Sequence, residues 1–331
     1  MIRVGIIGAT GFTGHELIKI LNRHPQVTLE IITTTAHAGK SISDLYPDLL
    51  GVDLTLELYS VDEMVRRKVD LVFLAVHHGA AMDFVPDLLN NGIKVVDLSA
   101  DFRFEDPTVY AKAYDTHRYP ELCKQAVYGL PEWFRRSIRK ANLIGNPGCY
   151  VTASLLPLIP LKDVISEVLI DAKSGVSGAG KKLDDAFLST QVMNNFKAYA
   201  IARHRHQPEI ETYAGLPIEF VPHLLPISRG ILATLYFKSD ESLKVLRARL
   251  VKAYADEPFV HVIDRDPEIR MVSGTNHCCM NIYPASHEGR FMIVSVIDNL
   301  LKGASGQAVQ NMNLMLGFPE EMGLDLVSVY P

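Results

Sequence analysis

The sequence predicts an α/β fold in two parts, a doubly wound parallel sheet followed by a mostly antiparallel sheet. Apolar strand patterns alternate with helical patterns through residues 2–145. The first strand pattern runs into a glycine-rich turn and then into a helix. From residue 220 onward, strand patterns follow one another with few helices between them, which is typical of antiparallel sheets. A chain of 331 residues has room for two such domains.

Composition limits the class of protein. The chain is 48% hydrophobic and 21% charged, with a formal net charge of −5, as in ordinary globular domains. No Lys/Arg-rich run stands out, so we do not expect a nucleic-acid partner. No apolar run is long enough to span a bilayer, and the chain starts as a strand rather than a signal peptide, which predicts a cytoplasmic protein without a membrane partner. The four cysteines lack zinc-site spacing, so we expect no metal.

The stretch from Arg3 to Leu21 has the layout of a dinucleotide site. A buried-strand pattern ends at Ile7, glycines follow at three-residue intervals, and a helical pattern begins at His15. This order provides a tight turn, close backbone approach to a pyrophosphate, and a helix N-terminus for its charge. A plain turn is the alternative. The candidate cofactor residues are Gly8, Ala9, Thr10, Gly11, Phe12, Thr13 and Gly14.

The end of the second strand, predicted over 27–32, indicates which dinucleotide binds. NAD sites place an acid there for the ribose hydroxyls, whereas this chain has three threonines, His37 and Lys40. The missing acid and the nearby lysine favour a 2′-phosphate, and therefore NADP(H), with Lys40 as a candidate ligand. The alternative is that His37 and Lys40 are solvated surface residues.

Other candidates follow later strand patterns of the first half. The patterns at 70–76 and 94–98 lead into His78-Gly79 and toward Arg103. Ligands of doubly wound sheets bind at the carboxyl ends of the strands, so we expect His78 and Gly79 near the cofactor and Arg103 near an anionic group. The pair of His77 and His78 does not predict a metal site, because adjacent residues at a strand end tend to point apart.

Residues 145–150, Gly-Asn-Pro-Gly-Cys-Tyr, place Cys149 directly after a sharp turn. A strand pattern at 141–145 precedes the turn, and an apolar helical run with small residues follows it. The strand carries the thiol to the sheet edge at which the cofactor is expected. A thiol at a helix N-terminus is activated by the helix dipole and by unpaired backbone N–H groups, which also stabilise an oxyanion. The alternative is a buried structural cysteine.

The second half carries further candidates. The loop 174–182 is rich in Gly and Ser and ends in two lysines, which suits an anion; a flexible loop is the alternative. His206 precedes a Pro-Glu pair typical of a first helical turn and is a candidate proton donor; a structural histidine is the alternative. Arg229 is a candidate anion ligand or a surface arginine. Small residues in a last helix, expected over 298–316, favour packing against the first domain.

Taken together, these motifs resemble the N-acetyl-gamma-glutamyl-phosphate reductase family over essentially the whole chain. Their order and spacing carry the resemblance. The family often has Ser-Arg where this chain has Thr34-Thr35, and Leu-Pro-His-Gly where it has residues 76–79. The matching motifs are Gly8–Gly11, Ser99–Arg103, Asn146–Tyr150, Ser174–Gly180, His204–Ile210, Val221–His223 with Arg229-Gly230, and Asp298–Ala304.

The resemblance implies a fold of the glyceraldehyde-3-phosphate and aspartate-semialdehyde dehydrogenase type. A Rossmann NADP-binding domain would span residues 1–148, an α+β catalytic and oligomerisation domain 149–301, and a C-terminal helix in 302–331 would return to the first domain. The implied activity is NADPH-dependent reduction of N-acetyl-L-glutamyl 5-phosphate to the 5-semialdehyde plus phosphate, in arginine biosynthesis. Cys149 would form a thioester, His206 would be the acid/base, and the protein would be a homotetramer or homodimer.

Further site residues come from the same resemblance. The additional cofactor ligands would be Ser177, Gly178 and Asn299. The substrate ligands would be Arg103, Asn146, Arg203 and Arg229. Three rivals stay open: a reductase for aspartyl phosphate or carrier-bound aminoadipyl phosphate, a non-catalytic NADP-binding sensor, and a sugar or alcohol dehydrogenase.

Overall fold

A computed structural model describes residues 1–181 and 194–328, and these divide into two compact units. The first unit comprises residues 1–147 and 304–325, and the second comprises the described residues of 148–303 with the chain after 325. The units are defined by packing alone, so the expected functional division at residues 148 and 301 stays a prediction. Lys182 of the predicted anion loop, and the last three residues of the predicted C-terminal segment, lie outside the described residues.

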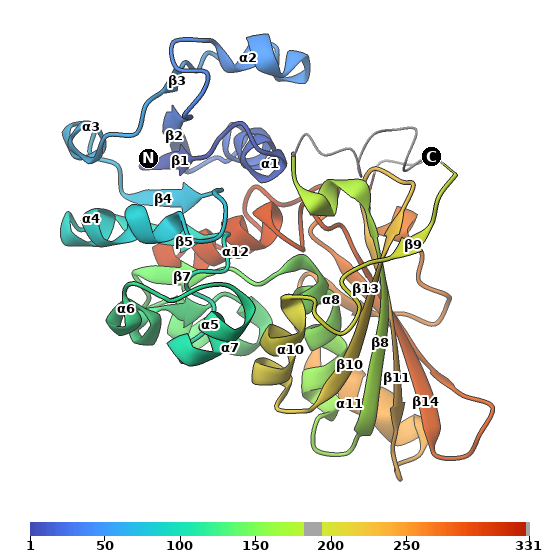
Figure 1. The fold of residues 1–331 in the computed structure, drawn as a ribbon. Coiled ribbons are helices and arrows are strands. Elements are labelled where there is room, and N and C mark those ends of the chain that lie inside the picture. The colour runs from blue at the N-terminus through green and yellow to red at the C-terminus, as the bar shows by residue number, and fades with distance from the viewer. Residues whose placement is uncertain (182–193, 329–331) are drawn as a thin grey trace. The chain divides into compact units, whose positions relative to one another are not determined.

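The first unit is built on a seven-stranded sheet whose strand pairs are all parallel, as predicted (Figure 1). Strand order is β3-β2-β1-β4-β5-β7-β6, so the winding reverses between β1 and β4, the point at which such sheets bind ligands. The strands are β1 (Ile2–Ile7), β2 (Val27–Thr33), β3 (Leu56–Glu57), β4 (Leu71–Leu74), β5 (Lys94–Asp97), β6 (Val127–Tyr128) and β7 (Leu143–Gly145).

Helices of the first unit begin where the sequence supplies caps. Ser60 and Asp106 accept backbone N–H groups at two N-termini, and prolines occupy the first position of three α-helices. The last helix, α12, packs on α1 and α7. The helices are α1 (Phe12–Leu21), α2 (Ile42–Leu45), η1 (Pro47–Leu49), α3 (Val61–Arg66), η2 (Ala81–Asp83), α4 (Val85–Asn90), α5 (Pro107–Ala113), α6 (Pro120–Gln125), α7 (Pro131–Ile138) and α12 (Ser305–Leu316).

The second unit contains a mixed seven-stranded sheet of order β12-β13-β14-β11-β8-β10-β9. Most neighbouring pairs are antiparallel, as predicted, but β8–β10 and β12–β13 are parallel. Parallel pairing of β8 with β10 requires a crossover, which contains helix α10. The strands are β8 (Ser166–Gly175), β9 (Lys197–Ala198), β10 (Ile218–Leu225), β11 (Ile231–Lys238), β12 (Val260–Val262), β13 (Cys278–Pro284) and β14 (Arg290–Ile297).

Helix α8 is the centre of this unit's core. Its residues 150–158 are all buried, which is the pattern of a helix surrounded by other elements. It contacts α10, β11 and β14, and α11 contacts β13 (Figure 1). The helices are α8 (Cys149–Leu158), η3 (Ile159–Leu161), η4 (Val176–Ala179), α10 (His206–Ala214), α11 (Leu243–Ala253) and η6 (Ile269–Met271).

One helix boundary predicted from the sequence is wrong. The last helix was expected from residue 298, but α12 begins at Ser305. The buried carboxylate of Asp298 accepts the backbone N–H groups of Gly274, Leu300 and Leu301, and this holds the chain in turns before the helix. Within the described chain, no helix is long and apolar enough to cross a membrane.

Candidate active site

The glycine turn between β1 and α1 leaves no room for side chains at two positions. A Cβ on Gly8, whose φ is +87°, would lie 2.3 Å from the carbonyl oxygen of Ala75, and one on Gly14 would lie 2.6 Å from the carbonyl oxygen of Gly8. Gly11, in contrast, has no atom nearer than 3.8 Å to its Cβ position. Backbone therefore packs tightly behind the turn and stays open at the N-terminus of α1, which is the shape that a pyrophosphate needs.

The candidate 2′-phosphate ligands lie after β2. Thr33 and Thr34 are buried, and the Thr34 hydroxyl accepts the backbone N–H of Ala36. His37 is half-buried, whereas Lys40 is exposed on the turn that follows. Of these residues, Lys40 has the charge and the exposure that a 2′-phosphate ligand requires.

Asp101 fixes the loop that carries His78 and Gly79. Its buried carboxylate accepts the backbone N–H groups of Gly79 at 2.7 Å and Ala81 at 3.1 Å, and the hydroxyl of Tyr110 at 2.9 Å. Nδ1 of His78 in turn accepts the backbone N–H of Ala100 at 3.0 Å. The loops after β4 and β5 are thus held together by side chain–backbone hydrogen bonds. Sequence reasoning named the Ser99–Arg103 run but did not assign a role to its carboxylate.

Arg103 and Asn146 are buried rather than exposed to a substrate. Nε of Arg103 donates to the carbonyl oxygen of Asn146 at 2.7 Å, and Nη2 donates to that of Leu98 at 3.0 Å. The Asn146 amide donates to the carbonyl oxygen of Ala304 and accepts from Asn311. These contacts favour an anchoring role for both residues over the substrate-binding role expected from the resemblance.

A second buried carboxylate lies beside this arginine. Asp97, at the end of β5, accepts the backbone N–H and the hydroxyl of Ser99 at 2.9 and 2.8 Å. Burial and the nearby Asp101 raise the pKa of Asp97 to about 7, and the guanidinium of Arg103 opposes that shift. The charges at the carboxyl end of β5 therefore form one buried cluster.

Cys149 is the first residue of α8, and its side chain is partly exposed. Gly148 is the N-cap of the helix, with φ −67° and ψ 150°. The ring of His206 lies directly over Gly148: a Cβ there would be 2.6 Å from Nε2. The structure therefore brings the candidate base, His206, against the residue that precedes the candidate nucleophile. Cys149 and His206 are the first residues of two helices of the same unit.

Glu209 is a site residue that sequence reasoning treated only as a helix former. It lies one turn after His206 in α10 and is completely buried. Its Oε1 accepts the backbone N–H of Gly148 at 3.1 Å. Helix α10 thus holds Gly148 from two sides, with a carboxylate on its N–H and an imidazole over its Cα. The signal available in the sequence was an acid three residues after the histidine.

The remaining candidates of the second unit are linked to one another. The Asn299 amide donates to the hydroxyl of Ser177 at 2.9 Å and accepts the backbone N–H of Gly230 at 2.6 Å. Gly178 lies in the same short helix, η4, where a Cβ would be 2.7 Å from a serine hydroxyl. Asn299 therefore joins the predicted anion loop to the start of β11.

The two arginines predicted in this unit differ in environment. Arg229 forms a two-pronged ion pair with the fully buried Asp298, with Nη2 donating at 3.0 Å and Nε 2.7 Å from the other carboxylate oxygen. Arg203 is exposed and follows two residues in unusual backbone conformations, since Ala200 and Ala202 have positive φ. Arg229 is thus fixed in direction before any ligand arrives.

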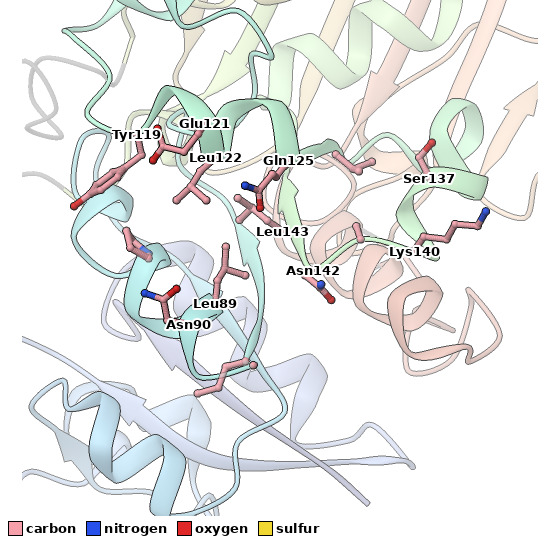
Figure 2. Close-up of a pocket in the computed structure, with 15 residues that line it drawn as sticks. Leu89, Asn90, Tyr119, Glu121, Leu122, Gln125, Ser137, Lys140, Asn142 and Leu143 are labelled. Atoms are coloured by element: carbon pink, nitrogen blue, oxygen red, sulfur yellow. The ribbon is translucent and has the colours of Figure 1, made fainter.

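A hollow of the first unit lies away from the predicted cofactor site. It has a volume of about 870 Å³ and is lined from the amino ends of β5 and β7 by Ile93 and Asn142, and from α6 by Leu122 and Gln125 (Figure 2). The glycine turn follows the carboxyl end of β1, at the opposite edge of the sheet. No predicted site residue lines this hollow. Across residues 1–181 and 194–328, no group of three or more potential metal-ligating side chains occurs.

Comparisons with known proteins agree with the fold. Residues 3–141 match the family model described as "Semialdehyde dehydrogenase, NAD binding domain", and residues 149–299 match "Semialdehyde dehydrogenase, dimerisation domain". Among solved structures, aspartate semialdehyde dehydrogenase II from Vibrio cholerae matches with a TM-score of 0.73 at 18% identity, over 96% of this chain and 98% of that one. The aspartate semialdehyde dehydrogenase with NADP from Candida albicans matches with a TM-score of 0.73 at 15% identity, over 96% and 99%. These two likenesses confirm the predicted dehydrogenase fold.

Full-length relatives are much more similar in sequence. The N-acetyl-gamma-glutamyl-phosphate reductase of Halothermothrix orenii is 46% identical, with all of both chains covered. Those of Heliobacterium modesticaldum and Geobacter metallireducens are 45% and 46% identical, again over the whole of both chains. The chain therefore belongs to the N-acetyl-gamma-glutamyl-phosphate reductase family.

Proposed function

We propose that the protein reduces N-acetyl-L-glutamyl 5-phosphate with NADPH to N-acetyl-L-glutamate 5-semialdehyde and phosphate, a step of arginine biosynthesis. One observation carries the chemistry: Cys149 starts α8 while the His206 ring covers the adjoining Gly148. A thiol at a helix N-terminus beside an imidazole is the arrangement used for acyl transfer through a thioester. The full-length relatives supply the substrate, since their name states it.

In the first half-reaction, His206 accepts the thiol proton and the Cys149 sulfur attacks the acyl-phosphate carbonyl carbon. The oxyanion that forms lies at the N-terminus of α8, where backbone N–H groups lack partners within the helix. Breaking the bond between the carbonyl carbon and the phosphate oxygen releases inorganic phosphate and leaves the thioester. Glu209 keeps the turn in place meanwhile, because its carboxylate holds the N–H of Gly148.

In the second half-reaction, NADPH would supply, when bound, the hydride that reduces the thioester carbon. The carbon–sulfur bond then breaks, the semialdehyde leaves, and His206 returns its proton to the sulfur. The open backbone at Gly11 and the N-terminus of α1 fit the pyrophosphate of such a cofactor, and Lys40 is the proposed 2′-phosphate ligand. His78, Gly79, Ser177, Gly178 and Asn299 stay proposed cofactor ligands.

Arg229 is the best-supported anion ligand for the substrate. Its ion pair with Asp298 fixes the guanidinium, and about a fifth of the side chain, 22%, stays exposed. Arg203 is exposed and is the second proposed ligand. We assign Arg103 and Asn146 to anchoring the turn before Cys149, because both residues are buried, with 5% and 1% of their surface exposed, and both donate to backbone carbonyl oxygens.

Assembly and location follow from the family. The match to a dimerisation domain supports a homo-oligomer, dimer or tetramer, and a biosynthetic reductase of this kind belongs in the cytoplasm.

The reverse reaction tests the proposed function. Purified protein mixed with N-acetylglutamate semialdehyde and NADP should sustain NADPH formation over many turnovers only when phosphate is added. Parallel assays with aspartate semialdehyde and with carrier-bound aminoadipate semialdehyde should give much lower kcat/KM. Phosphate-independent turnover, or a preference for either alternative substrate, would overturn the assignment.

A further inference from the structure

His204, two residues before the proposed base, caps the helix that carries it. Its Nδ1 accepts the backbone N–H of His206 at 3.1 Å, and its carbonyl oxygen accepts that of Gln207 at 3.0 Å. The first N–H groups of a helix have no partner within the helix. A side chain that accepts from the residue two positions later fixes the direction in which the chain enters the helix. His204 therefore sets where α10 begins.

The imidazole of His204 is held by four other rings. Its centroid lies 4.8 Å from that of His206, 5.3 Å from Phe220, and 5.6 Å from both Tyr150 and Tyr199, all at steep interplanar angles. Edge-to-face packing of this kind constrains the orientation of each ring. His204 thus contacts both the proposed base and the residue that follows Cys149.

Both tyrosines of this ring cluster are anchored in turn. The Tyr150 hydroxyl donates to the carbonyl oxygen of His223 at 3.0 Å, and the Tyr199 hydroxyl donates to the hydroxyl oxygen of Tyr150 at 3.2 Å. The two tyrosine rings that contact His204 are therefore held in place by their hydrogen bonds. A rotation of the His204 ring would have to displace them.

The hydrogen bond requires one protonation state. Nδ1 can accept only when it carries no proton, which assigns the neutral ring with the proton on Nε2. Burial, with a smaller contribution from the adjacent Arg205, lowers the pKa of His204 to about 4. The ring of His204 is therefore neutral near pH 7.

We propose that His204 is a positioning residue: by accepting the N–H of His206, it keeps the His206 ring over Gly148, the residue before Cys149. The proposal rests on the proposed function for the role of His206. It assigns to the first histidine of the His-Arg-His motif a role distinct from proton transfer, since its own Nδ1 is used by the backbone.

Two substitutions separate the hydrogen bond from the ring. In His204→Asn, the side-chain oxygen occupies the place of Nδ1 and can still accept, whereas His204→Phe keeps an aromatic ring and removes the acceptor. We expect kcat of H204F to fall about 10- to 100-fold, as for a misplaced catalytic group, and kcat of H204N to stay within about 5-fold of the original protein. KM for NADPH should be unchanged in both. Equal kcat values for the two variants would overturn the proposal.

A measurement without substrate separates this proposal from the proposed function. The rate of alkylation of Cys149 by iodoacetamide, followed by peptide mass spectrometry across pH, reports the His206–Cys149 pair directly. H204N should reproduce the original pH profile and H204F should not. If the two variants differ in this way but the protein has no reductase activity, the proposed function is wrong and the positioning role of His204 is supported. Superimposable profiles in an active reductase would sink the positioning role alone.

Discussion

Substituting Gly148 by alanine is the sharpest structural test of the site. The backbone there, at φ −67° and ψ 150°, accepts any L-residue, so the change adds no backbone strain. The new Cβ would lie 2.6 Å from Nε2, 2.9 Å from Cε1 and 3.0 Å from Cδ2 of His206. Ordinary contact begins at 3.4 Å, so the ring must withdraw by about 0.8 Å.

The expected effect is on turnover rather than on folding. A misplacement of about 1 Å costs about 100-fold in rate, so G148A should lose about 30- to 100-fold in kcat, or about 2–3 kcal/mol of transition-state stabilisation. The free energy of unfolding should change by less than about 1 kcal/mol, because glycine and alanine differ modestly at an N-cap. Steady-state kinetics and denaturant unfolding measure the two quantities.

A double-mutant cycle supplies the control. In a His206→Ala background the new methyl group meets no ring, so G148A should add little to the loss already caused by H206A. Turnover of G148A close to that of the original protein would refute the reasoning. So would an equal further loss from G148A in both backgrounds, since the effect would then not pass through His206.

Three other predictions follow from the same contacts. Glu209→Ala leaves the N–H of Gly148 buried without a partner and should cost about 1–3 kcal/mol of unfolding free energy, with Glu209→Gln costing less; denaturant titration of both variants decides. Arg229→Ala strands the buried Asp298 carboxylate and should cost about 3 kcal/mol or more, and adding Asp298→Asn should restore part of it; full additivity would refute the ion pair. Burial and a neighbouring arginine lower the pKa of His204 from 6.5 to about 4. As pH falls below 6.5, the unfolded chain therefore binds a proton at this residue before the folded chain does. The free energy of unfolding should accordingly be unaffected by His204 above pH 6.5 and should decrease as pH falls from 6.5 toward 4. The loss is at most about 3 kcal/mol, and H204F should show a shallower decline of stability over that range.

The fold was largely predictable because periodicity is local. Alternation of strand and helix patterns predicted the parallel sheet of the first unit. Helix α8 could be expected because an apolar run follows a Pro-Gly turn. The start of α12 could not, because the turns at 298–304 depend on a carboxylate whose partners include the distant Gly274.

The site was predictable only in its chemically active groups. Cys149 and His206 stand out because their chemistry and their places before helices are local features. The roles of Glu209 and Arg103 are not local: the Glu209–Gly148 bond spans 61 residues and the Arg103–Asn146 bond spans 43. In a sequence, a charged side chain that hydrogen-bonds to the backbone cannot be distinguished from one that binds a substrate. Burial distinguishes the two, and burial is a property of the fold.

Covalent capture of Cys149 tests the central claim most directly. With N-acetylglutamate semialdehyde and NADP but no phosphate, the thiohemiacetal can lose hydride while the thioester has no phosphate to attack it. The account predicts a burst of NADPH stoichiometric with protein, and an N-acetylglutamyl group on the peptide that contains Cys149, released on adding phosphate. Absence of both the burst and the acylated peptide in a protein that turns over with phosphate, or sustained turnover by Cys149→Ser, would contradict the account.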